Sequence, residues 1–202
     1  MATPRLCSAN KTYLKTKIQS LFGLATLNST IMSQDLVHPA AMESHQLLDK
    51  CEVQRSKRSG PGGQHRNKVE TAIVITHRPS GVKGEASERR SQHENHRVAL
   101  FRLRVNLALE IRTVRDEEQT PSELWQARCP AGRIAINPGH DDFPTLLAEA
   151  LDVLSANDWN IKLAAECLEC TTSQLAKFLK LDWRADALAS RSRTRKSKDQ
   201  AE

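Results

Sequence analysis

One loop, residues 58–68, concentrates the residues that could do chemistry. It places three glycines and a proline within four positions, follows them with Gln64 and flanks them with cations. Such a cluster is expected where only glycine can adopt the backbone geometry or permit a close approach. Two phosphate-binding patterns fail on spacing, because no Gly-Lys-Ser/Thr follows Gly60 and the third glycine of G-x-G-x-x-G would fall on His65. From composition alone, a flexible turn between two strands remains the alternative.

Segments on both sides of the loop resemble, in order and spacing, the GGQ domain of class I peptide chain release factors. Within that family, the short codon-independent peptidyl-tRNA hydrolases that rescue stalled ribosomes are the nearer match. The resemblance covers residues 51–115 and departs from the family pattern at Arg66 and Ser87. Its blocks are Glu52-Val53-Gln54-Arg55, Ser59-Gly60-x-Gly62-Gly63-Gln64-His65-x-Asn67, 71–76, Thr76-His77-x-Pro79-x-Gly81 and Glu88-x-Arg90-Ser91-Gln92-x-x-Asn95.

The resemblance implies a catalytic role for Gly62, Gly63 and Gln64 in hydrolysing the ester between the nascent chain and P-site tRNA. That reaction develops an oxyanion, which an aimed backbone N–H can stabilise by about 3 kcal/mol. In the family picture the Gln64 amide is this donor, and two preceding glycines leave its approach open. The side chain of Gln64 shapes the pocket so that water reaches the carbonyl. The ribosome supplies the remaining environment, and no cofactor is implied.

Polar and basic residues near the loop are expected to contact phosphates of large-subunit ribosomal RNA or the tRNA acceptor end, which makes binding salt-dependent. The rescue hydrolases also end in a basic tail that occupies the empty mRNA channel, and the C-terminal segment is a candidate for that role. The predicted RNA-binding residues are Arg58, Ser59, His65, Arg66, Asn67, Lys68, Arg90, Ser91, Gln92, Arg191, Arg193, Arg195, Lys196 and Lys198.

Charge divides the chain into a basic and an acidic part. Residues 50–115 hold 15 Lys/Arg against 6 Asp/Glu, whereas residues 141–183 hold 3 against 8, within a formal net charge of +6. The basic part suits a polyanionic partner. Five scattered cysteines favour reduced thiols, so we expect a cytoplasmic protein. No apolar run approaches the roughly 20 residues that cross a bilayer.

No metal site is predicted either. Cys167-x-x-Cys170 has no second pair of ligands nearby, and the two histidines of His93-Glu94-Asn95-His96 are spaced i, i+3 instead of the i, i+4 of a zinc-binding helix.

The pattern around the loop predicts a small sheet covered by one helix. Strands are expected over residues 52–57, 71–76 and 82–86, after a short helix over 41–49. Ser91-x-x-Glu94 is a capping box and should start the long helix. That helix is expected to cover the sheet with Leu100, Leu103, Leu107, Ile111 and Val114, and to turn Arg97, Arg102, Arg104 and Arg112 toward solvent or RNA.

The whole chain is therefore predicted to be α+β. We expect a GGQ domain over residues 45–118, a linker over 119–140, an acidic three-helix module over 141–183 and a disordered basic tail over 184–202. Residues 1–44 are expected to be a disordered leader or sequence upstream of the true start. A mitochondrial transit peptide over 1–34, and hence a matrix location, is the alternative.

Residues 164–179 resemble a helix-turn-helix, although Glu169 stands where a turn glycine is common. Thr171 or Thr172 is expected to cap its second helix. That helix offers only Lys177 and Lys180, and the module is net negative, which disfavours DNA binding and favours docking to a protein or the ribosome.

Three functions remain open. The first is a ribosome-dependent peptidyl-tRNA hydrolase, acting as a monomer without stop-codon recognition. The second is a non-catalytic ribosome- or RNA-binding protein that retains the loop, and the third is a helix-turn-helix DNA-binding regulator. The intact Gly62-Gly63-Gln64 favours the first over the second, because an RNA-binding relic does not need that glutamine.

Overall fold

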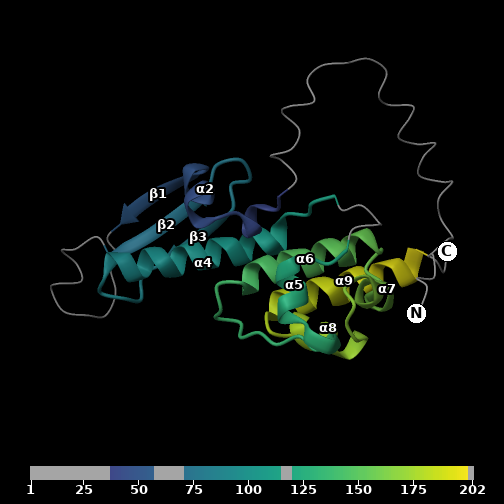
Figure 1. Cartoon of the computed structure of the whole chain (residues 1–202). Coiled ribbons are helices and arrows are strands. Elements are labelled where there is room, and N and C mark those ends of the chain that lie inside the picture. Colours follow the sequence, from purple (N-terminus) through teal and green to yellow (C-terminus); the bar gives the residue numbers. More distant parts are fainter. Residues whose placement is uncertain (1–36, 57–70, 115–119, 200–202) are drawn as a thin grey trace, which may run out of the picture. The chain divides into compact units, whose positions relative to one another are not determined.

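The computed structural model describes residues 37–56, 71–114 and 120–199, with side chains as far as Arg191, and all of them belong to one compact unit, Leu36–Glu202. Within these ranges the chain forms a three-stranded sheet, seven α-helices and two short 3₁₀ helices (Figure 1). The predicted α+β class is confirmed. None of the described helices has the length and apolar character of a membrane span.

The sheet is antiparallel, in the order β1 (Cys51–Ser56), β2 (Ala72–His77) and β3 (Lys83–Ala86). All three predicted strands are confirmed to within one or two residues. Isoleucines alternate along β2, and both Ile73 and Ile75 are buried, as expected for a strand that turns one face to a core. The loop over residues 57–70 joins β1 to β2.

Helix α4 (Gln92–Glu110) packs against β2 and β3 on one side and against α6 (Phe143–Ala156) on the other (Figure 1). Its predicted start is confirmed, because the Ser91 hydroxyl accepts the Glu94 N–H at 3.4 Å. Leu103 and Leu107 are fully buried, as predicted.

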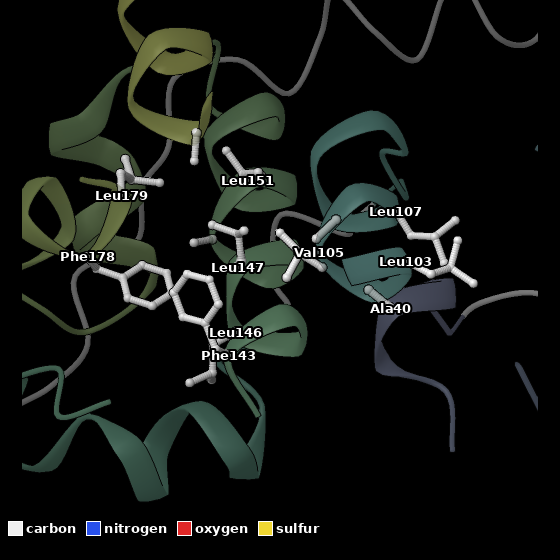
Figure 2. Close-up of a cluster of buried hydrophobic side chains, with 14 of the residues drawn as sticks. Ala40, Leu103, Val105, Leu107, Phe143, Leu146, Leu147, Leu151, Phe178 and Leu179 are labelled. Carbon is white, nitrogen blue, oxygen red and sulfur yellow. The ribbon is translucent and has the colours of Figure 1, made fainter. Parts of the chain in front are cut away.

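The predicted single apolar stripe on α4 is incomplete. Val114 lies beyond the end of the helix and is 94% exposed, whereas Val105 and Ala108 are buried on a second face. Figure 2 shows Val105 directed at Leu147 of α6, while Leu103 and Leu107 lie on the other side of α4. A helix between two layers is apolar on two faces, so a one-stripe pattern misses half of its contacts.

A short N-terminal segment also packs on α4. The 3₁₀ helix η1 (Pro39–Ala41) contacts α4 and α6, and Ala40 is fully buried. The predicted leader boundary at residue 44 is therefore wrong for residues 37–44, which belong to the folded unit. Helix α2 (Ser44–Asp49) then leads into β1 and is shorter than the predicted helix. Residues 1–36 lie outside the described residues.

The segment predicted to be a linker is folded. Helix α5 (Glu123–Arg128) begins at Ser122, whose hydroxyl accepts the Trp125 N–H at 3.0 Å, and the 3₁₀ helix η2 (Pro130–Gly132) follows. The Trp125 side chain is 1% exposed and donates from Nε1 to the Leu168 carbonyl at 2.9 Å. Prolines and glycines made this stretch look unstructured, but one buried tryptophan anchors it.

The helical module consists of α5, α6, α7 (Ile161–Cys167), α8 (Thr172–Leu179) and α9 (Trp183–Asp199). Its core contains an edge-to-face aromatic set. Phe178 lies 5.8 Å from the Trp125 ring and 5.6 Å from the Phe143 ring, measured between centroids (Figure 2 shows the two phenylalanines). Aromatic pairs of this geometry add about 1 kcal/mol each beyond their buried area.

The turn between α7 and α8 keeps the predicted helix-turn-helix character. Glu169 has φ +52°, the left-handed conformation that usually selects glycine at such a turn. Thr171 caps α8 by accepting the Gln174 N–H at 3.3 Å, which settles the choice between the two threonines.

The predicted disordered tail is wrong as far as Asp199, because Trp183–Asp199 form α9. Ala185 of this helix is fully buried, and Leu188 and Ala189 pack partly buried against the core. The first two turns of α9 thus belong to the module, and its high content of arginine, lysine and alanine favours continuing the helix.

A single glycine sets the separation between the sheet and α4. A methyl group on Gly84 would lie 2.3 Å from the Ala99 carbonyl oxygen and 2.4 Å from the Leu103 nitrogen. Both are backbone atoms of α4, so neither can move aside without moving the helix.

We therefore predict that Gly84→Ala lowers the free energy of unfolding by about 1–3 kcal/mol, the usual cost of overpacking a core. Gly139→Ala is the matched control, because its added methyl would meet only the Asn137 side chain at 3.4 Å. Urea unfolding of both variants checks the prediction. Equal stability of Gly84→Ala and wild type would show that α4 does not depend on this close approach.

Candidate functional site

The structure describes the two ends of the 57–70 loop. Ser56 pairs with Ala72 across the β1–β2 ladder. At the end that leads into β2, the Thr71 carbonyl accepts a hydrogen bond from Nδ2 of Asn95 at 2.7 Å. The predicted catalytic residues Gly62, Gly63 and Gln64 lie outside the described residues, as do Arg58, Ser59, His65, Arg66, Asn67 and Lys68.

Asn95 joins three segments at the base of this loop. It is fully buried in the first turns of α4, where a polar amide is stable only if its hydrogen bonds are made. Besides the Thr71 bond, Nδ2 donates to the Arg89 carbonyl at 2.8 Å, and Oδ1 accepts the Arg89 N–H at 2.9 Å. The sequence placed Asn95 in a family block without assigning it a role, and the structure makes it a support of the loop.

The other predicted residues of this block lie beside Asn95. Arg90 is exposed, as an RNA contact requires, and Gln92 is half-buried at the start of α4. Ser91 is exposed, and its hydroxyl caps α4. The preceding turn is held by Arg102, which donates to Glu88 at 2.6 Å and to the Glu85 carbonyl at 2.8 Å. This hydrogen bond from Arg102 lowers the pKa of Glu88.

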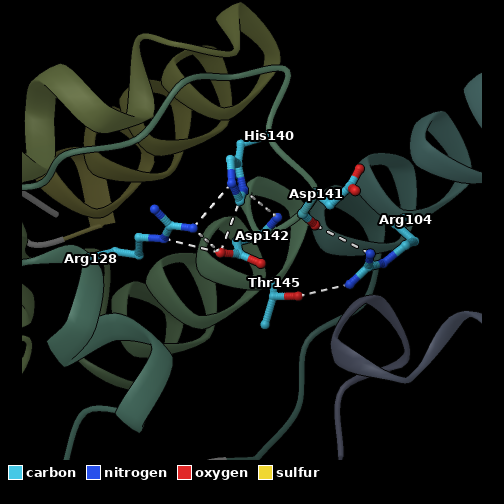
Figure 3. A network of polar contacts seen from close by, with 6 residues as sticks. All are labelled: Arg104, Arg128, His140, Asp141, Asp142 and Thr145. Atoms are coloured by element: carbon cyan, nitrogen blue, oxygen red, sulfur yellow. Dashed lines mark hydrogen bonds and ion pairs between the residues drawn. The ribbon is translucent and has the colours of Figure 1, made fainter.

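Besides Arg102, two more of the arginines predicted to face solvent or RNA bind the protein itself. Arg104 donates to the Ala40 carbonyl at 2.9 Å. It also donates to Thr145 Oγ1 at 3.0 Å and to the Asp141 carbonyl at 3.3 Å (Figure 3). Burial lowers the pKa of Arg104, and neighbouring carboxylates oppose that shift. Arg104 thus joins η1 and α6 to α4. Arg97 and Arg102 are exposed, as predicted.

Arg112 is the second correction. Its guanidinium donates to the Ala108 carbonyl at 2.7 Å and to the Leu109 carbonyl at 2.8 Å, and it lies 5.9 Å from the Trp159 ring centroid. A cation at these last carbonyls stabilises the C-terminal end of a helix. The next residue, Thr113, donates from its N–H and its hydroxyl to the buried Asp152 carboxylate of α6.

A cluster of Arg128, His140 and Asp142 contains groups that could transfer protons (Figure 3). Arg128 donates twice to Asp142 Oδ2, at 2.6 and 3.0 Å, and lies 3.1 Å from His140 Nε2. Asp142 precedes the first turn of α6, where a carboxylate offsets the positive end of the helix dipole. The cluster therefore fastens α5 to the start of α6, and its carboxylate is already bound.

Two cysteines of the helical module, Cys129 and Cys170, are poorly suited to nucleophilic chemistry. Burial raises the pKa of the Cys129 thiol, and burial together with Cys129 raises that of Cys170 to about 11. Both thiols are protonated at neutral pH, and the thiolate is the reactive form. In the described ranges, no three His, Cys, Asp or Glu side chains gather in a way that could hold a metal ion.

Two buried histidines complete the polar contacts of the N-terminal part. His38 accepts the Ala40 N–H at Nδ1, at 3.0 Å, and donates from Nε2 to the Ile111 carbonyl at 3.3 Å, which requires the neutral ring. His77 lies 2.7 Å from Ser80 Oγ through Nδ1, while its buried Nε2 has no hydrogen-bond partner among the described residues. Burial is the main cause that lowers the pKa of both rings.

Asn95 yields the first prediction of this site. Asn95→Ala leaves the Arg89 and Thr71 backbone groups without their partner, which should cost about 1–3 kcal/mol of unfolding free energy. Hydrogen exchange of the Ala72 amide should also accelerate, because the end of the loop loses its tie. Gln54→Ala, which removes an exposed amide bonded only to Glu52, is the control. Unchanged exchange at Ala72 would contradict the supporting role.

The buried histidines predict loss of stability in mild acid. Because their pKa values are lowered in the fold, the unfolded chain binds protons first as the pH falls below about 6.5. Their contribution is fully present above that pH and is lost below it, by at most about 1.4 kcal/mol per pH unit for each ring.

Urea unfolding at pH 7.5 and 5.5 measures this loss. We expect His38→Gln to reduce the difference between the two pH values. His45→Gln, at an exposed position of α2, should leave it unchanged. A wild-type stability that does not change between these pH values would refute the assignment.

Comparison with known proteins concerns the N-terminal part of the chain. The RF-1 domain family model matches residues 45–132, which extends through α5 and η2, past the predicted domain end at residue 118. The chain is 41% identical over 68 residues to "Peptide chain release factor 1" of Rickettsia typhi (strain ATCC VR-144 / Wilmington). This similarity covers 34% of the chain and 19% of that release factor, so the chain spans about a fifth of its relative. No solved structure matches the chain.

Proposed function

Because residues 45–132 match the RF-1 domain, the GGQ-containing domain of class I release factors, we propose that this protein hydrolyses peptidyl-tRNA on the ribosome. The match to this domain and the similarity to a release factor support a release-factor-like peptidyl-tRNA hydrolase. The observation that carries the proposal is the Gly62-Gly63-Gln64 triplet inside this domain, on the loop between two paired strands.

The proposed reaction is attack of water on the ester carbonyl carbon of the nascent chain. The C–O bond to the tRNA ribose then breaks, the ribose oxygen takes a proton, and the free carboxyl end of the peptide leaves. The backbone N–H of Gln64 donates to the oxyanion of the tetrahedral state, an interaction of about 3 kcal/mol in comparable sites. Gly62 and Gly63 leave that N–H accessible, and the Gln64 side chain admits water in preference to larger nucleophiles.

The described residues support the proposal by holding the loop at both ends. Ser56 and Ala72 pair in the sheet, the Asn95 amide binds the carbonyl of Thr71, and α4 packs on β2 and β3. A donor that acts in the transition state is effective only if it is positioned beforehand. A sheet fastened to one long helix provides a rigid base for such a loop.

We further propose that the reaction occurs without stop-codon recognition, in the rescue of stalled ribosomes. The basic end of the chain supports this role. Five of the six cations of α9, all but Arg184, lie at or beyond Arg191, after the turns that pack on the module. Large-subunit ribosomal RNA and P-site peptidyl-tRNA would be the partners of the GGQ domain, and the mRNA channel would receive the basic end.

Peptide release from ribosomes with a labelled peptidyl-tRNA in the P site tests the reaction. We predict that Gly63→Ala abolishes release, because the added methyl keeps the ester carbonyl from approaching the Gln64 N–H. We predict that Gln64→Ala lowers release severely, because the side chain that admits water in preference to larger nucleophiles is lost. Gly139→Ala is the control for the same chemical change outside the loop. Release by Gly63→Ala at the wild-type rate would overturn the mechanism.

The choice of message tests the rescue role. Release should occur on a message truncated in the P site and should not depend on a stop codon. Truncating the protein after Ser190 removes the predicted basic contacts but keeps the buried Ala185 and the packed Leu188. We expect that variant to lose release on truncated messages while its unfolding free energy is retained. Release that requires a stop codon would contradict the rescue role.

A further inference from the structure

The acidic composition of the helical module overstates the negative charge of its surface. Several of its carboxylates are bound internally: Asp142 contacts Arg128 at 2.6 Å, and Asp152 is buried against Thr113. Glu149 accepts from the Ser122 hydroxyl at 2.5 Å. These three acids and Asp182, half of the eight over residues 141–183, bind groups of the protein itself, so the sequence count overstates the acidic charge at the module's surface.

One face of α8 is basic. Ser173, Lys177 and Lys180 are exposed and are spaced i, i+4, i+7, which places them on one side of the helix. Leu175, Phe178 and Leu179 form the opposite, buried side. The exposed face therefore presents a hydroxyl and two ammonium groups.

An exposed tryptophan follows α8 in the chain, three residues after Lys180. Hydrogen bonds from the Leu181 N–H to Phe178 and from the Asp182 N–H to Leu179 continue the turn beyond α8. They bring the chain to Trp183, whose side chain is 76% exposed. The core does not need this indole, because Trp125 and the phenylalanines already fill the module's aromatic core.

The one acid in this stretch is neutralised. The Asp182 side chain is 12% exposed, and Arg184 donates to it from Nη2 at 2.8 Å and from Nε at 3.1 Å. Arg184 also donates to Asn106 of α4 at 2.7 Å, which fixes the start of α9 on the N-terminal part. Ser173, Lys177, Lys180 and Trp183, hereafter the α8 patch, are all exposed within one short stretch of the chain, which carries two positive charges and whose one acid is paired with Arg184.

We propose that the α8 patch binds single-stranded RNA, with one base stacked on Trp183 and neighbouring phosphates on Lys177 and Lys180. Proteins that hold single strands combine cations along the backbone with aromatic rings on which bases stack. Unpaired bases are required for stacking, so a duplex would use only the charges. This contact goes beyond the release reaction and does not require peptidyl-tRNA.

A neighbouring cavity of about 600 Å³ is the less suitable place for the phosphates. Leu181 and Arg184 line it together with Lys83 and Arg102. Arg184 is already paired with Asp182, and Arg102 with Glu88. The lysines of α8 have no such carboxylate in the contacts described, and for that reason we place the phosphates there.

Binding of the full-length protein to a fluorescein-labelled RNA of A and C, which cannot pair with itself, tests the proposal. We expect Trp183→Leu to weaken binding about tenfold, in keeping with the loss of one stacked base. Wild-type tryptophan emission should be quenched on binding, and the quench should be lost in this variant. Leu163→Ala, at another exposed apolar residue of the module, is the control.

The lysines are tested by salt dependence. In Lys177→Gln/Lys180→Gln the slope of log affinity against log salt should fall by about 1.4, the value for two phosphates of a single strand. Lys162→Gln, on the neighbouring α7, should leave the slope unchanged. Unchanged affinity and quenching in Trp183→Leu would overturn the proposal, as would tighter binding of duplex DNA than of the RNA. Gly63→Ala should bind this RNA like wild type, so a failure of the release reaction is distinguishable from a failure of the patch.

Discussion

Helix α4 lies so close to β3 that only a glycine fits between them. Gly84 faces the α4 backbone at Ala99 and Leu103, and the opposite side of the helix carries Val105 toward α6 (Figure 2). Both layers are therefore positioned against one helix. The same helix contributes Asn95 to the base of the 57–70 loop and Asn106 to the start of α9. The base of the loop at Thr71 and the start of the C-terminal helix at Arg184 share this support.

Charged groups in this protein serve structure and surface in different places. Arg104, Arg112 and Arg128 are bound to carbonyls or carboxylates of the chain, although they contribute to the positive count of the sequence. The carboxylates of Asp142 and Asp182 are bound in the same way. The net charge of a segment thus describes its surface poorly. Some arginines and carboxylates that enter the count are bound to ion-pair partners or to helix ends and are not presented to solvent. Among the residues described with side chains, the exposed lysines of α8 remain available to a polyanion, as do Arg90 and Arg97.

Local patterns predicted the strands, the Ser91 cap and the Thr171 cap, because each depends on residues close in sequence. They failed where distant packing decides. Trp125 anchors α5 by donating to a carbonyl 43 residues away, a contact that local patterns do not reveal, and they therefore predicted a linker there. Ala185 is buried because α9 packs on the module, and local patterns, which do not show this packing, predicted a disordered tail. Arg104 was assigned to solvent because its partners, Ala40 and Thr145, lie far along the chain. Of the predicted site, Arg90, Ser91 and Gln92 are described, and the catalytic triplet remains a prediction from the family pattern.

In the proposed mechanism the ribosome is part of the catalytic environment, since the proposed donor is a backbone N–H and the sequence around the loop offers no general base. The most direct test compares release of a labelled peptide from P-site peptidyl-tRNA on ribosomes with an empty A site and from the same peptidyl-tRNA free in solution. The account predicts release on the ribosome that saturates with protein concentration, and none above background in solution. Tight ribosome binding without release, or equal hydrolysis of the free substrate, would contradict it.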